Sequence, residues 1–483
     1  MDYGRGVVIR SFLWKLLERF SVQGLSLLIT LVLARILDPK DYGIVALITV
    51  FTSLSSVIVD GGLNMALIQK KDADQTDFST IFFSSIFISI LLYALLFLSA
   101  PLIASFYDNT SLTVVIRAFS VIIIFEAANA VQRAYVAKNM LFKKLFLSSI
   151  WALIISGGIG LYLAINGYGV WALVCQQVCS NIITTVVMFY TIKWFPSFTF
   201  SIIRFKKLFN FGWKIFGINM MVSFYQNVRS LIIGKYYSPA ALAFFERGYS
   251  LSQMIVSNIS SSMQTVIFPV LSDKQDDENR VKSLVRKSIR LSSYVIFPAL
   301  IALCVVAHPL IELILTEKWL PAVPYIWIFS IAYMIFIVQV SSMEAVKALG
   351  HSGFSLKFEI VKHIIETIIL IITVFIGVYA IAIGTIIYNL ISFILNIYPN
   401  IRYLRYGIKE QLEDILSSFF LSFLAGASVF WIQWLDIPNI IIIALQLLIG
   451  ATIYIGVSYL VKMGSFMYIK SMMFDRTKQR KTK

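Results

Sequence analysis

Seven polar side chains gather on one face of a segment that is otherwise apolar enough to cross a membrane. If residues 12–37 form a helix, in which each residue turns about 100°, these side chains fall within about 140° of arc. They are Ser11, Lys15, Glu18, Arg19, Gln23, Ser26 and Thr30. Charged groups are costly in lipid and therefore mark a polar interior and, by default, a pathway. The sequence predicts a water-filled cavity beside the charged end of this helix.

Two later segments carry related polar faces, compact in 240–271 and looser in 208–233. The residues are Glu246, Ser250, Gln253, Ser257, Ser260, Ser261 and Gln264 in the first, and Asn219, Ser223, Gln226, Asn227 and Ser230 in the second. Polar groups that face lipid lack hydrogen-bond partners, so all three helices should face each other or water. Helix packing through Ser, Asn and Gln is the alternative. Lys214 and Arg229 lie off the looser stripe and face either the cavity or a membrane interface.

Carboxylates inside the predicted spans are candidate ion-coupling groups. They are Glu18, Asp60, Glu126, Glu246, Glu359 and Glu366. Glu126 lies near mid-membrane, the most expensive depth for a charge, on a segment that also carries Arg117 and Arg133. Either a cation such as Arg19 neutralises Glu126, or its carboxylate titrates.

Three of these carboxylates have purely structural alternatives. Glu359 and Glu366 share one helical face with Lys362 and His363, at spacings that permit either a ladder of ion pairs or a proton relay. Asp60 precedes two glycines, so it either caps or bends the helix there or lines the cavity.

Membrane helices must position these side chains. The 483 residues are 59% hydrophobic and 14% charged, whereas a soluble domain has about 25% charged residues. With roughly 20 apolar residues per span, the chain is predicted to be an all-α polytopic membrane protein of about 14 transmembrane helices. The spans are 12–37, 42–65, 78–106, 112–137, 145–165, 169–192, 208–233, 240–271, 288–311, 322–346, 354–377, 380–400, 413–434 and 438–461.

Basic residues fall mainly on alternate connections, which sets the orientation. The odd-numbered connections between spans carry few basic residues, namely Lys40, Lys235 and Lys318. The bias toward basic cytoplasmic loops predicts that both termini are cytoplasmic and that the protein spans a membrane many times. These basic loops also explain the net charge of +16, so binding to nucleic acid is not needed to account for it. The basic tail either lies on anionic lipid head groups or is a solvated disordered tail.

Signals for soluble-enzyme chemistry are missing from the sequence. Three cysteines and three histidines show no metal-ligand spacing. No phosphate-binding loop, HExxH or GxSxG occurs. The sequence therefore predicts no catalytic residues, no cofactor and no metal.

A faint internal repeat relates the two halves of the chain. The starts of the first and seventh spans correspond around Trp14 and Trp213, and the turns that follow them correspond around Pro39 and Pro239. Both copies begin on the same side, as in transporters built from two similar bundles with the site at their interface. The predicted domains are 1–200, 201–405, and a third, 406–483, with two extra helices and a basic tail.

Several motifs together resemble a known family. They are Leu33-Ala34-Arg35-Ile36-Leu37-Asp38-Pro39-Lys40-Asp41-Tyr42-Gly43, Phe224-Tyr225-Gln226-Asn227, Leu231-Ile232-Ile233-Gly234-Lys235, Arg247-Gly248-Tyr249-Ser250-Leu251, Phe268-Pro269-Val270-Leu271-Ser272 and Trp319-Leu320-Pro321-Ala322-Val323-Pro324. In their order and spacing they resemble the Wzx-type polysaccharide-transporter flippases. That family shares a superfamily with multidrug (MATE) exporters and the lipid II flippase.

The resemblance implies two pseudo-symmetric six-helix bundles around a central cavity, with two further C-terminal helices. It also implies an oligosaccharide repeat unit on undecaprenyl diphosphate as the substrate, moved from the cytoplasmic to the outer leaflet by alternating access. Membrane lipids, H⁺ or Na⁺, a polysaccharide polymerase and chain-length machinery would be its partners. The family often has an acidic residue where this chain has Arg229, which suggests a more cationic cavity.

The expected head-group contacts are cavity cations and polar side chains. They are Lys15, Arg19, Gln23, Arg133, Lys214, Asn219, Gln226, Asn227, Arg229, Gln253 and Ser257. A multidrug or cation antiporter is the first alternative, although cationic drugs need an acidic cavity. A membrane glycosyltransferase or polymerase is the second, because Asp38 and Asp41 in the first outer turn could hold a metal.

Overall fold

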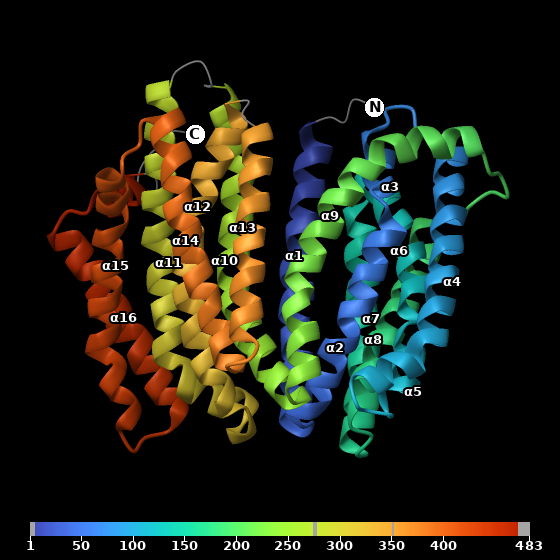
Figure 1. Ribbon diagram of the computed structural model, residues 1–483, viewed down its shortest axis with the longest axis horizontal. Helices are drawn as coiled ribbons and strands as arrows, with labels where there is room; N and C mark the ends of the chain where they lie inside the picture. The colour runs from blue at the N-terminus through green and yellow to red at the C-terminus, as the bar shows by residue number, and fades with distance from the viewer. Residues whose placement is uncertain (1–4, 274–277, 350–351, 472–483) are drawn as a thin grey trace. The chain divides into compact units, whose positions relative to one another are not determined.

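The computed structural model describes residues 5–273, 278–349 and 352–471, and its regular elements are helices (Figure 1). In chain order they are α1 (Arg5–Ile36), α2 (Pro39–Asp60), α3 (Leu63–Gln69), α4 (Gln75–Phe106), α5 (Leu112–Phe119), α6 (Ile122–Lys138), α7 (Phe142–Ile165), α8 (Val170–Ile192), α9 (Ile202–Tyr236), α10 (Pro239–Asp273), α11 (Glu278–Leu315), η1 (Glu317–Ala322), α12 (Val323–Ala348), α13 (Ser352–Thr373), α14 (Val378–Leu404), α15 (Ile408–Phe430), η2 (Trp431–Trp434) and α16 (Asn439–Leu460). Each predicted span is helical. Two are broken, since 42–65 forms α2 and α3, and 112–137 forms α5 and α6.

Eleven segments of the described chain are long and apolar enough to cross a membrane. They account for every predicted span except those that form α9, α10 and α13. These three helices are 35, 35 and 22 residues long, but they carry many of the polar residues predicted to line a cavity. The all-α polytopic fold class is confirmed, whereas the count of fourteen crossings and the orientation stay predictions.

Packing divides the helices into two compact units, Met1–Ala243 and Phe244–Lys483, called unit 1 and unit 2 below. In unit 1, α7 packs against α1 and α8, while α2 packs against α9, α6 and α4. In unit 2, α11 packs against α12, α15 and α16, and α14 packs against α12 and α13. α9 therefore packs with unit 1. The domain limits predicted at 200 and 405 follow the sequence repeat and stay predictions.

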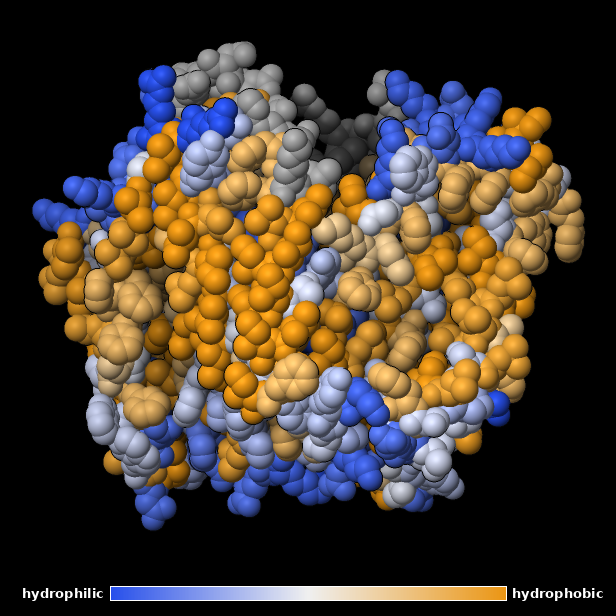
Figure 2. Space-filling view, viewed as in Figure 1, coloured by the Kyte–Doolittle hydropathy of each residue, from blue (hydrophilic) through white to orange (hydrophobic). Residues whose placement is uncertain are grey.

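Each unit is apolar around its middle and polar at its two ends (Figure 2). Large apolar side chains are exposed there, including Leu98 on α4, Ile372 on α13 and Leu448 on α16. Exposed apolar surface of this extent requires a covering, because soluble monomers rarely show patches larger than a few hundred Å². A bilayer provides that covering along helices of this length.

The two turns that the sequence repeat pairs have the same local structure. α1 ends at Ile36 and α2 begins at Pro39, just as α9 ends at Tyr236 and α10 begins at Pro239. The turns also touch, since a Cβ on Gly43 would lie 1.7 Å from the carbonyl oxygen of Pro239. Only glycine fits at this contact, so the motif glycine at position 43 has a packing role.

Two glycines break the second span after Asp60. Gly61 and Gly62 have φ values of +48° and +69°, in the left-handed region that favours glycine. A Cβ on Gly62 would lie 2.2 Å from the carbonyl oxygen of Gly212, so α9 crosses the break in close contact. Asp60 accepts a hydrogen bond from the Asn64 amide across it. The bend is therefore present, and a cavity-lining role for Asp60 stays a prediction.

A buried aspartate joins three chain segments at one end of unit 1. The Asp77 side chain, in the first turn of α4, is fully buried and forms ion pairs with Lys70 and Arg204. Asp74 caps the same helix, accepting from the Asp77 amide at 3.0 Å, and also pairs with Arg204. The Arg204 hydrogen bond favours the charged carboxylate and lowers the pKa of Asp74 to about 2.

Replacement of Arg204 by Gln should therefore give a pH-dependent loss of stability. A carboxyl with a depressed folded-state pKa stabilises the fold above its ordinary pKa of 3.8, and this contribution disappears as the pH falls toward about 2. Thermal melts of the purified protein should show a constant gap between wild type and Arg204→Gln above pH 5. The gap should narrow below pH 4. A difference in melting temperature that does not change with pH down to 2.5 would contradict the assigned role of Asp74. The matched control is Lys206→Gln, on the exposed face of α9.

Candidate functional site

The polar stripe of α1 is largely open within unit 1. Lys15 and Arg19 are exposed, and Gln23 is half-buried. Lys15 Nζ lies 2.8 Å from Glu18 Oε2 one turn along the helix. Ser11 is the exception, because it is buried and donates to the Met140 carbonyl oxygen at 3.1 Å. Its place on the predicted stripe therefore serves packing, while the charged residues remain accessible.

Glu126 lies on a seam between α6 and α2. Its Oε1 is 3.4 Å from Arg133 Nη2, and its Oε2 accepts a hydrogen bond from Ser56 Oγ at 3.4 Å. The Glu126 and Arg133 side chains are 36% and 42% exposed, so the pair is half open in a spanning segment. Asp60 follows Ser56 by one turn of α2. The sequence suggested Arg19 as the neutralising cation, but in the structure Arg133 lies beside Glu126.

α9 has a packed face and an open face. Ser223 and Ser230 are buried, and Asn227 donates to the Ser223 carbonyl oxygen at 2.7 Å. This face therefore serves helix packing, which was the alternative interpretation of these polar residues. Lys214, Asn219 and Gln226 are exposed on unit 1, and Arg229 is half-buried. Lys214, Asn219 and Gln226 are therefore the polar residues of α9 most available to a ligand.

α10 packs against α12 in unit 2 through small residues. A Cβ on Gly248 would lie 2.4 Å from the Tyr325 Cβ, and Ser252 Oγ lies 3.2 Å from Ser330 Oγ. On another face, Ser257 is exposed and Glu246 is half-buried. Gln253 Nε2 donates to the Tyr249 hydroxyl at 3.1 Å, so it is already oriented by a neighbour. The side chains of Ser261 and Gln264 lie outside the described residues.

α13 carries the predicted pairs of opposite charge. Lys362 Nζ lies 2.9 Å from Glu359 Oε1, and His363 Nδ1 lies 3.1 Å from Glu366 Oε2. Lys362 is only 3% exposed, so its charge is compensated within the helix. The predicted neighbours therefore contact each other along the helix, Lys362 and Glu359 as an ion pair, and a role of Glu359 or Glu366 in coupling stays a prediction.

Across residues 5–273, 278–349 and 352–471, no three His, Cys, Asp or Glu side chains are grouped to hold a metal ion. Cys175, Cys179 and Cys304 are free thiols.

Sequence reasoning missed a network between α11 and α15. The buried Asp414 carboxylate accepts from Arg286 Nε and Nη2 at 2.8 and 2.9 Å, and from Arg290 Nε at 2.6 Å. The Tyr406 hydroxyl also donates to it, at 2.8 Å. Glu410 accepts from Arg286 Nη1 at 2.9 Å. Basic residues at i and i+4 on α11 were visible in the sequence, but their partners lie more than 120 residues away.

These features place polar and cationic side chains on a helical membrane scaffold, and comparison with known proteins gives the family. A family described as "Polysaccharide biosynthesis protein" matches residues 32–324. The chain belongs to this family. The resemblance found in the sequence motifs is therefore confirmed, and the protein is a multi-pass bacterial membrane protein.

Similarity to relatives of this family member covers most of the chain. An uncharacterized membrane protein in the cps region of Klebsiella pneumoniae is 26% identical, covering 92% of this chain and 93% of its own. The teichuronic acid biosynthesis protein TuaB of Bacillus subtilis is 25% identical over 63% of each chain. The lipopolysaccharide biosynthesis protein WzxC of Escherichia coli is 20% identical, covering 72% of this chain and 71% of its own.

Solved structures show the same fold. The lipid II flippase MurJ in an inward closed conformation has a TM-score of 0.75 at 16% identity, covering 92% of this chain and 98% of that one. An inward-facing multidrug resistance MATE transporter has a TM-score of 0.61 at 13% identity, covering 78% and 94%. This polysaccharide biosynthesis family member therefore shares its fold with MurJ and with that MATE transporter.

Proposed function

We propose that this protein is a flippase that moves undecaprenyl-diphosphate-linked oligosaccharide repeat units from the cytoplasmic to the outer leaflet for surface polysaccharide synthesis. The observation that carries the proposal is its membership of a polysaccharide biosynthesis family, combined with cations held inside membrane spans. TuaB and WzxC bear names that place them in the synthesis of cell-surface polymers.

The open cations of unit 1 suit a diphosphate head group. Lys15 and Arg19 are exposed on α1, and Arg133 is half open on α6. Arginine binds phosphate oxygens through two parallel N–H donors, while lysine acts as a compact point charge. Because charged side chains in a span face water or the protein interior, these residues define a face on which an anion can move through the membrane.

Amide and hydroxyl groups supply partners for the sugars. Asn219, Gln226 and Ser257 are exposed and can both donate and accept hydrogen bonds. The polyprenyl tail stays in the bilayer while the head group crosses by alternating access, as transporters built from repeats operate. Such transport needs no covalent chemistry and no cofactor, so the protein is not an enzyme under this proposal.

Glu126 is the proposed coupling group for an H⁺ or Na⁺ gradient. It lies within the α5–α6 span, and among the described residues Arg133 and Ser56 approach its carboxylate, each at 3.4 Å. Binding of an anionic head group by Arg133 would draw that cation away from Glu126 and so link substrate binding to this carboxylate.

The MATE likeness does not favour a drug exporter. At 13% identity it concerns the fold, and a carrier of cationic drugs needs uncompensated carboxylates. In the structure Glu18, Glu126, Glu359 and Glu366 each lie beside a basic side chain. Arg19 and Lys214, by contrast, are exposed cations.

Deletion of the gene should stop export of one surface polymer and cause its lipid-linked repeat unit to accumulate. The measurement is mass analysis of extracted lipid-linked oligosaccharides together with the amount of surface polysaccharide. The intact gene, supplied on a plasmid, should restore both and is the control. Unchanged lipid intermediates with altered drug tolerance would overturn the proposal in favour of an exporter. Short glycans displayed on the outer face would indicate a polymerase.

A further inference from the structure

One end of α11 carries a cationic cavity that transport of the oligosaccharide does not use. Within unit 2 a cavity of about 380 Å³ lies between α11 and the helical residues 464–471 that follow α16. Its polar lining comprises Ser283, Arg286, Lys287, Arg290, Ser465 and Tyr468. Three cations line it, against the carboxylates of Asp414 and Glu410 that pair with Arg286 and Arg290, so the surplus charge is positive and suited to an anion.

The cations of this cavity are held in place by neighbours. Arg286 and Arg290 are fixed by Asp414, yet the Arg290 side chain remains 49% exposed. Lys287 Nζ lies 3.5 Å from the centroid of the Tyr468 ring, in the range of a cation–π contact. Met463, Phe466 and Ile469 pack against Leu421 and Tyr454 and their neighbours, so the segment that closes the cavity has an apolar anchor.

The cavity lies where a span begins. Between Arg290 and His308, α11 has 17 consecutive residues without a charged side chain, close to the 20 or so needed for the hydrocarbon core. Arg290 therefore lies at the edge of the hydrocarbon, at the depth of lipid phosphates. Lysine and arginine at such positions are attracted to anionic head groups by about 1 kcal/mol each in other membrane proteins.

An apolar groove continues from the cationic cavity. A second cavity, of about 580 Å³, shares Arg290, Gly464 and Ser465 with the first. Its lining is polar near Arg290, where Glu413, Asp414, Ser417 and Ser418 lie, and apolar at Leu421, Leu424 and Val457. A free phosphate ion has no apolar surface to bury in this extension, whereas an acyl chain does. The two cavities together therefore match a phosphate that carries hydrocarbon chains.

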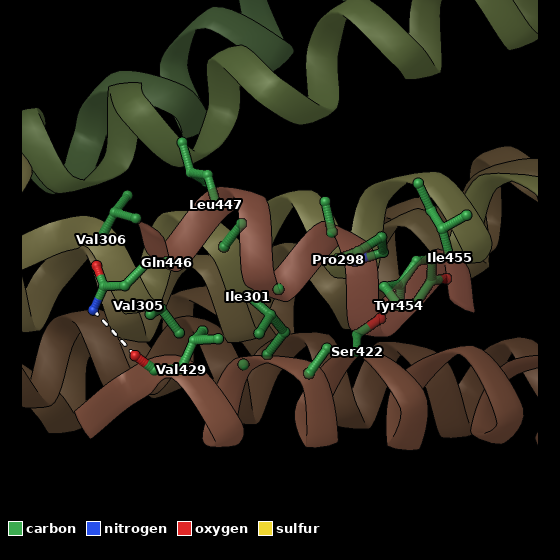
Figure 3. Close-up of a pocket in the computed structure, with 15 residues that line it drawn as sticks. Pro298, Ile301, Val305, Val306, Ser422, Val429, Gln446, Leu447, Tyr454 and Ile455 are labelled. Atoms are coloured by element: carbon green, nitrogen blue, oxygen red, sulfur yellow. Dashed lines mark hydrogen bonds between the residues drawn. The ribbon is translucent and has the colours of Figure 1, made fainter. Parts of the chain in front are cut away.

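The walls of this groove are fixed by packing along the same three helices. Figure 3 shows α11, α15 and α16 meeting farther along, where Ile301, Ser422 and Tyr454 line a narrow cavity of about 190 Å³. A Cβ on Gly426 of α15 would lie 2.3 Å from Ile301 Cγ2. The Tyr454 hydroxyl donates to the Tyr294 carbonyl oxygen at 2.8 Å. A preformed site loses less conformational freedom on binding than one that must assemble.

We propose that the cavity formed by Arg286, Lys287, Arg290 and Ser465 binds the phosphate of an anionic phospholipid, whose acyl chains lie along the α15–α16 groove. The site lies beside the basic connection that precedes α11, which the sequence predicts to be cytoplasmic. It stands independently of the proposed transport reaction, since none of its residues belongs to the candidate site for the oligosaccharide. A bound lipid fastens the last two helices to α11.

Binding can be measured on the full-length protein purified in a neutral detergent. Dioleoyl phosphatidylglycerol, dioleoyl phosphatidylcholine and sodium glycerophosphate are titrated separately, and the rise in melting temperature gives an apparent affinity. The test variant is Lys287→Gln, because this lysine lies at the exposed edge of the cavity. Lys409→Gln removes the same charge at an exposed position outside the cavity lining and is the control.

Phosphatidylglycerol should stabilise the wild type more than phosphatidylcholine does, and glycerophosphate should have no effect. Lys287→Gln should weaken the apparent affinity for phosphatidylglycerol about fivefold, while Lys409→Gln should retain the wild-type value. Equal weakening in both variants would overturn the proposal, because attraction would then depend on overall charge. Equal stabilisation by glycerophosphate would overturn the lipid assignment and leave a site for free phosphate.

Discussion

Replacement of Arg19 by Gln is expected to reduce polysaccharide export at least about tenfold without lowering the amount of protein in the membrane. Arg19 is exposed on α1, nine residues along the helix from Arg10, which places it about 13 Å farther into the membrane. A hydrogen bond to a charged group is worth roughly 1.5–3 kcal/mol, and each 1.4 kcal/mol is a factor of ten in binding. Loss of a direct contact to the diphosphate should therefore have a large effect.

The measurement is surface polysaccharide and lipid-linked repeat unit in a deletion strain that expresses each variant. Arg10→Gln is the matched control, because it removes the same side chain from the exposed end of the same helix, and it should leave export unchanged. Arg19→Lys keeps the charge without the two-pronged geometry and should recover part of the export. Normal export by Arg19→Gln at a normal protein level would remove Arg19 from the binding surface.

The helices could be predicted from the sequence because the membrane imposes one simple rule. A span needs a continuous apolar run and must satisfy its backbone polar groups internally, so each predicted segment forms helix. Even the break after Asp60 was readable, since Gly61 and Gly62 adopt backbone angles that glycine favours. These features depend on neighbours in the sequence, and no knowledge of the tertiary packing is required to find them.

The partners of the polar residues could not be predicted in the same way. Periodicity places Glu126 on a face of its helix, but only packing brings Ser56 of α2 to it, 70 residues earlier in the chain. Likewise Ser223 and Ser230 share a stripe with Gln226 in the sequence, yet two serines are buried and the glutamine is exposed. A stripe wider than the contact between two helices contains both packing residues and open ones.

The Asp414 network shows the same limit most clearly. Arg286 and Arg290 are basic residues near the start of a predicted span, which the sequence alone assigns to the cytoplasmic side. The structure adds the buried carboxylate of Asp414, 128 residues after Arg286, which orients both guanidinium groups. Burial raises the pKa of the Tyr406 phenol, which therefore stays protonated and donates to the same carboxylate.

Replacement of Asp414 by Asn is expected to destabilise unit 2 by about 2–4 kcal/mol. Removing one partner of a buried ion pair costs roughly 3–5 kcal/mol, and partial exposure of the arginines reduces this figure. The variant should lose much of its folded protein in the membrane, because the total stability of a domain is only about 5–15 kcal/mol. The measurement is the melting temperature and monodispersity of the purified protein, with Glu413→Gln, an exposed neighbour on α15, as the control. Equal melting temperatures for the two variants would mean that Asp414 does not hold α11 and α15 together.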